Sequence, residues 1–157
     1  GNPAKNHDTA NIILETLART GVRAVLSTGW SGLGTDRPLP ENIFLIKDTP
    51  HRWLFPRMAA IVHHGGAGTT GAALSAGVPS LIIPHFGDQY YWGRRVAELG
   101  VGPEPIERKK LSAERLAAAI STALHDSGML ERAASLGAKI SAEDGVARAV
   151  EIIRKHI

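Results

Sequence analysis

The side chains best suited to chemistry lie in one segment, from Ile61 to Gln89, which reads "IVHHGGAGTTGAALSAGVPSLIIPHFGDQ". Apolar residues typical of a strand lead through two histidines into a glycine-rich turn, and small residues typical of a helix follow. Glycine lets a ligand approach the backbone closely. The first N–H groups of a helix lack internal partners and carry partial positive charge. This succession of strand, glycine-rich turn and helix therefore predicts an anion site, suited to a phosphate, at a helix that begins near Gly68.

The residues around this turn add donors. Thr69 and Thr70 put hydroxyl groups at the same helix end, and a histidine just before the turn can approach a diphosphate from the side. No Walker Gly-Lys-Ser/Thr sequence occurs. The alternative is that the glycines only let the strand and the helix pack closely.

The adjacent histidines, His63 and His64, should point to opposite faces of a strand, so they are poorly placed to hold one metal together. No Asp, Glu or Cys at ligand spacing supports a zinc site, so we predict no metal. We expect one histidine to face a ligand and the other to pack beneath the helix.

Asp88 and Gln89 come just after the next apolar run. Ligands of open parallel sheets bind outside the carboxyl ends of the strands, so this pair is predicted to share a crevice with His64. A carboxylate beside an amide offers acceptors and donors together, which suits a polyhydroxylated ring. The alternative is that Asp88 only caps the following helix.

The rest of the chain supplies elements that would position these groups. Short apolar runs alternate with helical patterns, which predicts an α/β domain with a Rossmann-like, doubly wound parallel sheet. The expected strands span residues 22–29, 42–48, 59–65, 80–84 and, marked by prolines, 101–106. The expected helices span about 8–19, 68–76 and 88–99, one that Ser112 caps, and then 129–140 and 144–156. A loop and a helix open the chain, so the usual first, central strand is expected to be missing or replaced.

Composition limits the class of protein. The 157 residues fit one domain, with 43% apolar and 21% charged residues and a net charge of +3. That excess is too small to argue for nucleic acid, and Arg108-Lys109-Lys110 is interpreted as a solvated loop. Without cysteine, disulfides are excluded. No apolar run approaches the length of a membrane span and no secretory pattern opens the chain, so we expect a cytoplasmic location.

Several segments together resemble one family. They are "LSTGW", "DTPHRWLFPRMAAIVHHGGAGTT", "GVPSLIIPHFGDQYYWGRRVAELGVGP" and "AEDGVARAVEII", and they cover nearly the whole chain. The set is similar to the donor-binding, C-terminal domain of GT-B glycosyltransferases of the UDP-glucosyltransferase superfamily, above all bacterial antibiotic glycosyltransferases and sterol 3-beta-glucosyltransferases.

The resemblance implies that residues 1–157 form one lobe of an inverting hexosyltransferase. That enzyme would move a sugar from UDP or TDP to a hydroxyl of a lipophilic acceptor such as a sterol or polyketide, without a cofactor. Its N-terminal domain, which carries the acceptor pocket and the catalytic base, is absent from this sequence. We therefore expect the fragment alone to be inactive.

The resemblance also implies roles for particular residues. His64 would contact the donor diphosphate, and Asp88 and Gln89 would hold sugar hydroxyls. The remaining donor-binding residues would be Gly66, Ala67, Gly68 and Thr69 at the phosphates, and Thr49, His51 and Trp30 at the nucleobase. Trp53 is expected to pack. Plant members carry a ribose-contacting glutamate at the position of Ala72, so the choice between UDP and TDP stays open.

Two other functions remain open. The chain could be a non-catalytic nucleotide-sugar-binding or interaction module, or a GT-B-like nucleotide-sugar epimerase, which would need acidic catalytic residues. If the central strand is absent, exposed sheet edges could pair with a second copy of the chain. The sequence specifies neither the sugar nor the acceptor.

Overall fold

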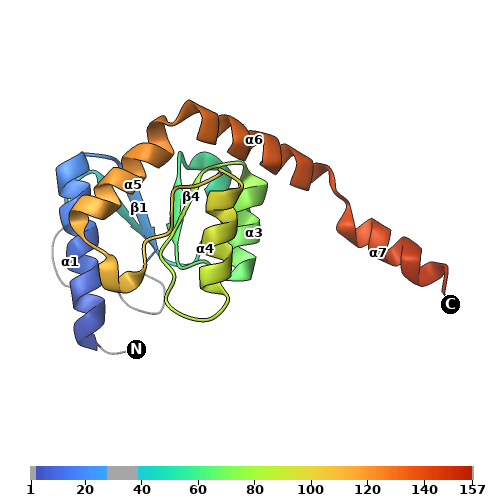
Figure 1. Cartoon of the computed structure of the whole chain (residues 1–157), viewed down its shortest axis with the longest axis horizontal. Coiled ribbons are helices and arrows are strands. Elements are labelled where there is room, and N and C mark those ends of the chain that lie inside the picture. Colours follow the sequence, from blue (N-terminus) through green and yellow to red (C-terminus); the bar gives the residue numbers. More distant parts are fainter. Residues whose placement is uncertain (1–2, 28–38, 157) are drawn as a thin grey trace.

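A computed structural model of the chain describes residues 3–27 and 39–156. Helices and strands alternate through the first two thirds of the chain, and helices alone follow (Figure 1). The strands are β1 (Ala24–Ser27), β2 (Ile43–Ile46), β3 (Ile61–His63) and β4 (Ser80–Ile82). The longer helices are α1 (Pro3–Thr20), α3 (Ala67–Ala76), α4 (Gln89–Glu98), α5 (Ala113–His125), α6 (Ser127–Ala142) and α7 (Gly145–Arg154). Short helical segments are α2 (His51–Leu54), η2 (Phe55–Arg57) and η3 (Arg108–Lys110).

The strands form two separate parallel pairs. β1 pairs with β2, with Ala24 opposite Ile43, and β3 pairs with β4, with Ile61 opposite Ser80. The prediction of an α/β fold with parallel strands is confirmed, but within the described residues the four strands do not join into one continuous sheet. In a doubly wound sheet the first strand is central. When the central strand of this order is missing, two separate pairs of strands remain, as observed here.

The expected fifth strand, residues 101–106, is not a strand. It runs beside β4 with only two ladder-like bonds: Ser80 N–H donates to the Val101 carbonyl at 3.1 Å, and Ile106 N–H donates to the Ile82 carbonyl at 3.0 Å. Between them stand Pro103 and Pro105, which have no N–H to donate. The prolines therefore keep this segment extended but prevent a regular ladder.

Side-chain caps fix several helix ends. Ser112 accepts a hydrogen bond from Arg115 N–H and begins α5, as predicted. Asp126 and Asp144 cap α6 and α7 in the same way. α1 begins at Pro3, so Asp8 lies inside that helix and is not its first residue, contrary to expectation. Gly21 ends it with a φ of 64°, a left-handed conformation that glycine adopts readily.

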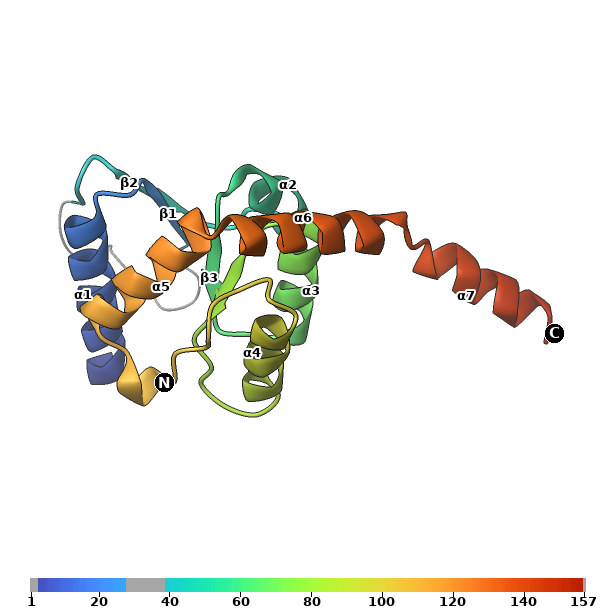
Figure 2. The ribbon, with the colours of Figure 1, turned by 45° about the horizontal axis from the view of Figure 1, so that its top comes forward.

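The helices cover the strands on two sides. α1 and α5 lie together on one side, α3 and α4 lie on the other, and α6 crosses the top to pack against α3 (Figures 1 and 2). α7 extends away from the body, and apolar side chains such as Val146 and Ile153 are exposed on it. β4 supplies the two largest side chains that are fully buried among the described residues, Leu81 and Ile82, so the core is centred on this strand.

Glycine contacts set the position of the α3 helix. A β-carbon on Gly137 of α6 would stand only 2.5 Å from the Gly77 α-carbon at the end of α3, so these helices touch backbone to backbone.

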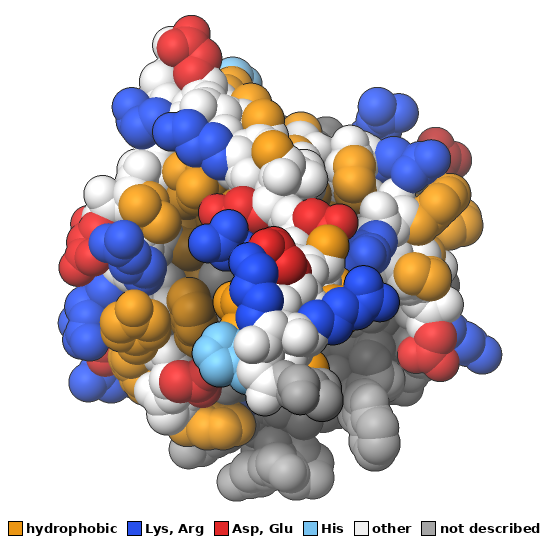
Figure 3. Space-filling view, turned by 90° about the vertical axis from the view of Figure 1, so that its right-hand side faces the viewer, with side chains coloured by type: hydrophobic (Ala, Val, Ile, Leu, Met, Phe, Trp, Pro, Cys, Tyr) orange, Lys and Arg blue, Asp and Glu red, His pale blue; other side chains and the backbone are white. Residues whose placement is uncertain are grey.

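Basic and acidic side chains are interspersed on the face that Figure 3 shows, and neither sign dominates it. Among the described helices, none is long and apolar enough to cross a membrane.

Candidate functional site

The α3 helix begins directly after the glycine turn, with Gly66 as its N-cap residue. No side chain caps it, and the first helical hydrogen bond runs from Thr70 N–H to the Gly66 carbonyl at 2.9 Å. The N–H groups of Ala67, Gly68 and Thr69 therefore precede the first bonded turn and remain available to a ligand. This end of α3 has the geometry and the partial charge of an anion site.

The two threonines differ. Thr70 is fully buried, and its hydroxyl donates to the Gly66 carbonyl at 2.9 Å. Its expected role as a free donor at the turn is therefore wrong, because the hydroxyl is used within the helix. Thr69 is half-buried and stays a candidate donor.

His64 lies over the turn. Its side chain is exposed, and a β-carbon built on Gly66 would stand 2.7 Å from His64 Nε2. Only glycine therefore lets the imidazole fold back over the N-cap position. As a result, Nε2 lies beside the uncapped N–H groups of α3, where it can share an anion with them.

His63 takes the other role expected of the pair. Its Nδ1 accepts a hydrogen bond from Gly65 N–H at 3.1 Å, and its Nε2 is buried without a partner. Burial, with smaller contributions from His64 and His51, lowers the pKa of His63 to about 4. His63 is therefore neutral near pH 7 and holds the turn, while His64 faces solvent.

The turn after β3 touches the start of α4. Gly65 has a φ of 92°, and a β-carbon there would stand 2.7 Å from Ile82 Cγ2 and 3.2 Å from the Gln89 carbonyl oxygen. Gln89 is only 5% exposed, and its Oε1 accepts from His85 N–H at 2.8 Å and Phe86 N–H at 3.2 Å. The side-chain oxygen thus shapes the loop after β4, which leaves the amide NH₂ as the part that can donate to a ligand.

Asp88 precedes Gln89 and is exposed. It occupies the N-cap position of α4, but its side chain makes no capping bond, so the capping alternative is wrong. Instead, its Oδ2 accepts a hydrogen bond from Trp92 Nε1 at 3.2 Å, one turn along the helix. The indole thus orients the carboxylate of this exposed residue.

Arg108 and His64 both lie near His85, in the loop after β4. Burial lowers the pKa of His85, and Arg108 and His64 lower it further. Arg108 is therefore close enough to act electrostatically on this loop, whereas Lys109 and Lys110 both pair with Glu107, at 3.0 and 2.9 Å. From the sequence alone, all three basic residues are interpreted as a solvated loop. The structure shows in addition that Arg108 lies close enough to His85 to lower its pKa.

Thr49 and His51 lie at the start of α2, where His51 is close enough to His63 to contribute to the lowering of its pKa. Thr49 is half-buried, and His51, which is exposed, stacks on Phe55 with ring centroids 4.4 Å apart. Trp53 does not pack in the core as expected. It is 56% exposed, and the Arg57 guanidinium lies 4.5 Å from its ring centre. Trp30 lies outside the described residues.

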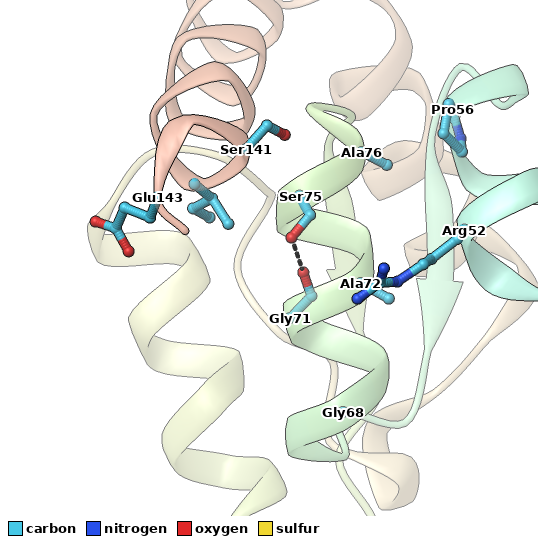
Figure 4. Close-up of a pocket in the computed structure, with 10 residues that line it drawn as sticks. Arg52, Pro56, Gly68, Gly71, Ala72, Ser75, Ala76, Ser141 and Glu143 are labelled. Atoms are coloured by element: carbon cyan, nitrogen blue, oxygen red, sulfur yellow. Dashed lines mark hydrogen bonds between the residues drawn. The ribbon is translucent and has the colours of Figure 1, made fainter. Parts of the chain in front are cut away.

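A cavity of about 620 Å³ runs along α3 from the end that carries Gly68. Figure 4 shows Arg52 reaching from α2 toward Ala72, with Ser141 and Glu143 at the end of α6 on the other side. The cavity contains Gly68 of the predicted site but not His64, Asp88 or Gln89. Sequence reasoning missed Arg52, whose only signal was a basic residue two positions after Pro50.

The described ranges contain no group of three or more His, Asp or Glu side chains that could hold a metal ion. The candidate site combines an uncapped helix N-terminus and an exposed histidine with the neighbouring side chains of Asp88 and Gln89. Its location, at the ends of neighbouring parallel strands, is where α/β proteins bind nucleotides.

Comparisons with known proteins place this fold in one class. The model of the C-terminal domain of the erythromycin biosynthesis protein CIII-like family matches residues 11–155. A sterol 3-beta-glucosyltransferase of Arabidopsis thaliana is 47% identical over 150 residues, and one of Aspergillus clavatus is 47% identical over 152 residues. The matches cover 95% and 92% of this chain but only 24% and 11% of those proteins.

Solved structures indicate the same class of protein. The kitacinnamycin glycosyltransferase superposes with a TM-score of 0.82 at 25% identity, over 95% of this chain and 38% of that one. A spinosyn rhamnosyltransferase in complex with thymidine diphosphate gives 0.79 at 26% identity, over 98% and 43%. The fold is that of a GT-B glycosyltransferase C-terminal lobe.

The chain belongs to the erythromycin biosynthesis protein CIII-like C-terminal domain family, as the sequence motifs indicated. It spans about a quarter or less of the length of the sterol glucosyltransferases it matches.

Proposed function

We propose that this chain binds the nucleoside-diphosphate-sugar donor of an inverting glycosyltransferase, which transfers a hexose to a hydroxyl of a lipophilic acceptor. His64 and the N–H groups of Ala67 to Thr69 bind the diphosphate, and Asp88 and Gln89 bind sugar hydroxyls. Thr49 and His51 lie on the nucleobase side. A partner domain of the same polypeptide supplies the acceptor pocket and the catalytic base.

One observation supports this proposal most directly. Gly65 lies against the backbone of Gln89, so the anion site of α3 and the carboxylate–amide pair of α4 share one edge of the fold. A diphosphate at the first would carry its sugar toward the second. A solved relative, the spinosyn rhamnosyltransferase, binds thymidine diphosphate, which agrees with this chemistry.

The proposed mechanism is electrostatic. When an acceptor oxygen attacks the anomeric carbon, the bond to the diphosphate oxygen breaks and negative charge develops on the leaving group. His64 and the α3 N-terminus stabilise that charge without a metal. Loss of one such preorganised donor costs on the order of 3 kcal/mol, so His64→Ala in the complete enzyme should lower turnover about a hundredfold.

Titration calorimetry of the 157-residue chain with UDP, TDP, UDP-glucose and TDP-glucose tests the binding step. At least one ligand should bind, and His64→Ala should weaken it by about tenfold or more, because a hydrogen bond to a charged group is lost. His125→Ala is the matched control, since His125 is exposed at the end of α5 and its ring hydrogen-bonds the Ser121 carbonyl of the same helix. No binding of any of the four ligands, or equal binding by His64→Ala, would refute the proposal.

The two alternative functions, an epimerase and a non-catalytic binding module, can be distinguished by the products that form. An epimerase would convert the donor into a sugar isomer or hydrolyse it without an acceptor, which NMR of the nucleotide sugar detects. A binding module would retain affinity for the ligand, but the complete polypeptide would transfer no sugar. Glycoside formed by the complete polypeptide with a sterol or polyketide alcohol excludes both.

A further inference from the structure

The cavity along α3 opens beside the proposed diphosphate site. Its lining includes Gly68, in the first turn of α3, and Arg52 of α2, and none of the described residues that line it belongs to α4. The carboxylate–amide pair of α4 meets the same helix end elsewhere, through the contact of Gly65 with Gln89. The cavity volume of about 620 Å³ is typical of small-molecule sites. A diphosphate at the α3 N-terminus that carries its sugar toward α4 therefore has its nucleoside on the side of this cavity.

Arg52 brings an unused positive charge to the cavity. Figure 4 shows its guanidinium reaching toward Ala72, while Glu143 lies across the cavity at the end of α6. Within residues 3–27 and 39–156, Arg52 forms no ion pair or hydrogen bond. Arg57 of the same segment differs, because it donates to the Trp53 carbonyl and lies over the Trp53 ring. The N–H donors of Arg52 therefore remain available to a ligand.

The part of α3 that faces Arg52 leaves room for a pentose. Ala72 has a side chain too short to reach a hydrogen-bonding partner, and a β-carbon on Gly68 would meet nothing within 4 Å. The pentose of a uridine nucleotide carries hydroxyls at both the 2′ and the 3′ position, whereas that of a thymidine nucleotide carries only the 3′-hydroxyl. A hydroxyl oxygen accepts hydrogen bonds, and a guanidinium only donates them, so the two groups are complementary.

We propose that Arg52 is a specificity-determining residue, which donates a hydrogen bond to the ribose 2′-hydroxyl and thereby distinguishes ribonucleotides from deoxyribonucleotides. This inference rests on the proposed function, because it takes the diphosphate to bind at the α3 N-terminus. With a deoxyribonucleotide the guanidinium gains no such bond but stays hydrated, since Arg52 is exposed. Discrimination should therefore be about tenfold, the effect of one hydrogen bond to a charged group, and far below that of a site that buries an unpaired donor.

Calorimetry with four nucleotides tests the proposal. UDP, 2′-deoxy-UDP, 5-methyl-UDP and TDP combine the presence or absence of the 2′-hydroxyl with the presence or absence of the 5-methyl group. The 157-residue chain should bind the two ribonucleotides about tenfold more tightly than the two deoxyribonucleotides, whichever base they carry. In Arg52→Ala this ratio should fall to about one. The ratio cancels any general attraction between the lost charge and the diphosphate, because all four ligands share that group.

Arg57→Ala is the matched control. It removes the same charge from the same segment, but Arg57 is held over Trp53 and does not line the cavity. The preference for ribonucleotides should therefore persist in Arg57→Ala at about tenfold.

Two results would overturn the proposal. Equal binding of ribonucleotides and deoxyribonucleotides by the unchanged chain would mean that the 2′-hydroxyl meets no donor. A preference that Arg52→Ala retains would assign the 2′-hydroxyl to another residue. In both cases the nucleotides still bind, so the donor-site proposal stands, whereas no binding of any of the four nucleotides would refute both proposals.

Discussion

The α-carbon of Gly65 packs against the backbone of Gln89, so closely that a β-carbon on Gly65 would stand 3.2 Å from the Gln89 carbonyl oxygen. This contact joins the turn after β3 to the first residue of α4. It brings an uncapped helix end and a carboxylate–amide pair to one edge of the fold. With a φ of 92°, position 65 also favours glycine for its backbone conformation alone.

Gly66→Ala should weaken diphosphate binding without unfolding the protein. The residue has a φ of −62°, which alanine adopts freely, but its methyl group would stand 2.7 Å from His64 Nε2. The imidazole must rotate away, so we expect the Kd for UDP or TDP to rise about tenfold while the free energy of unfolding changes by less than about 1 kcal/mol. Gly71→Ala is the control, because nothing lies within 4 Å of its added methyl group. Unchanged affinity in Gly66→Ala would place the anion elsewhere.

Asp88→Asn should separate binding of the sugar from binding of the nucleotide. Asparagine can still accept the hydrogen bond from Trp92 Nε1 but has lost the charge that strengthens bonds from sugar hydroxyls. We expect about tenfold weaker binding of the nucleotide sugar and an unchanged Kd for the nucleoside diphosphate, both measured by calorimetry. Trp92→Phe keeps the charge but frees the carboxylate, and should give a smaller loss of the same kind. Equal losses for both ligands in Asp88→Asn would contradict a role at the sugar.

His63 should make stability depend on pH. The folded pKa is about 4 and the reference value is 6.5, so above pH 6.5 the imidazole is neutral in both states and contributes nothing. Between pH 6.5 and 4 the unfolded chain takes up a proton that the folded chain does not. The free energy of unfolding therefore falls as the pH falls, by up to about 3 kcal/mol from this group.

His63→Asn isolates this contribution, because its amide oxygen can replace Nδ1 as acceptor for Gly65 N–H but does not titrate. Urea unfolding at several values between pH 7 and 4 should show a shallower decline in the variant. Some slope should remain, since the pKa of His85 is also lowered. Parallel curves for the two proteins would mean that His63 takes up its proton without unfolding.

The turns and helix ends of this fold can be predicted from the sequence alone. A histidine before three glycines, a run of small residues and an apolar strand predict a strand, a tight turn and a helix with an open N-terminus, because glycine freedom and helix ends obey local rules. Ser112 likewise predicts the start of α5 from its side chain alone. The family motifs also predict these turns, caps and helix ends, because the motifs are the same local sequence patterns in a fixed order.

Tertiary packing decided what the side chains do. Thr69 and Thr70 have the same donor group, but only burial shows that Thr70 is bonded to its own helix. Asp88 has the type and position of a cap, yet Trp92 takes its carboxylate. Residues 101–106 have the pattern of a strand, but two prolines leave too few N–H groups for a ladder. These outcomes depend on which partner competes successfully for each polar group, and that competition is settled only when distant segments come into contact.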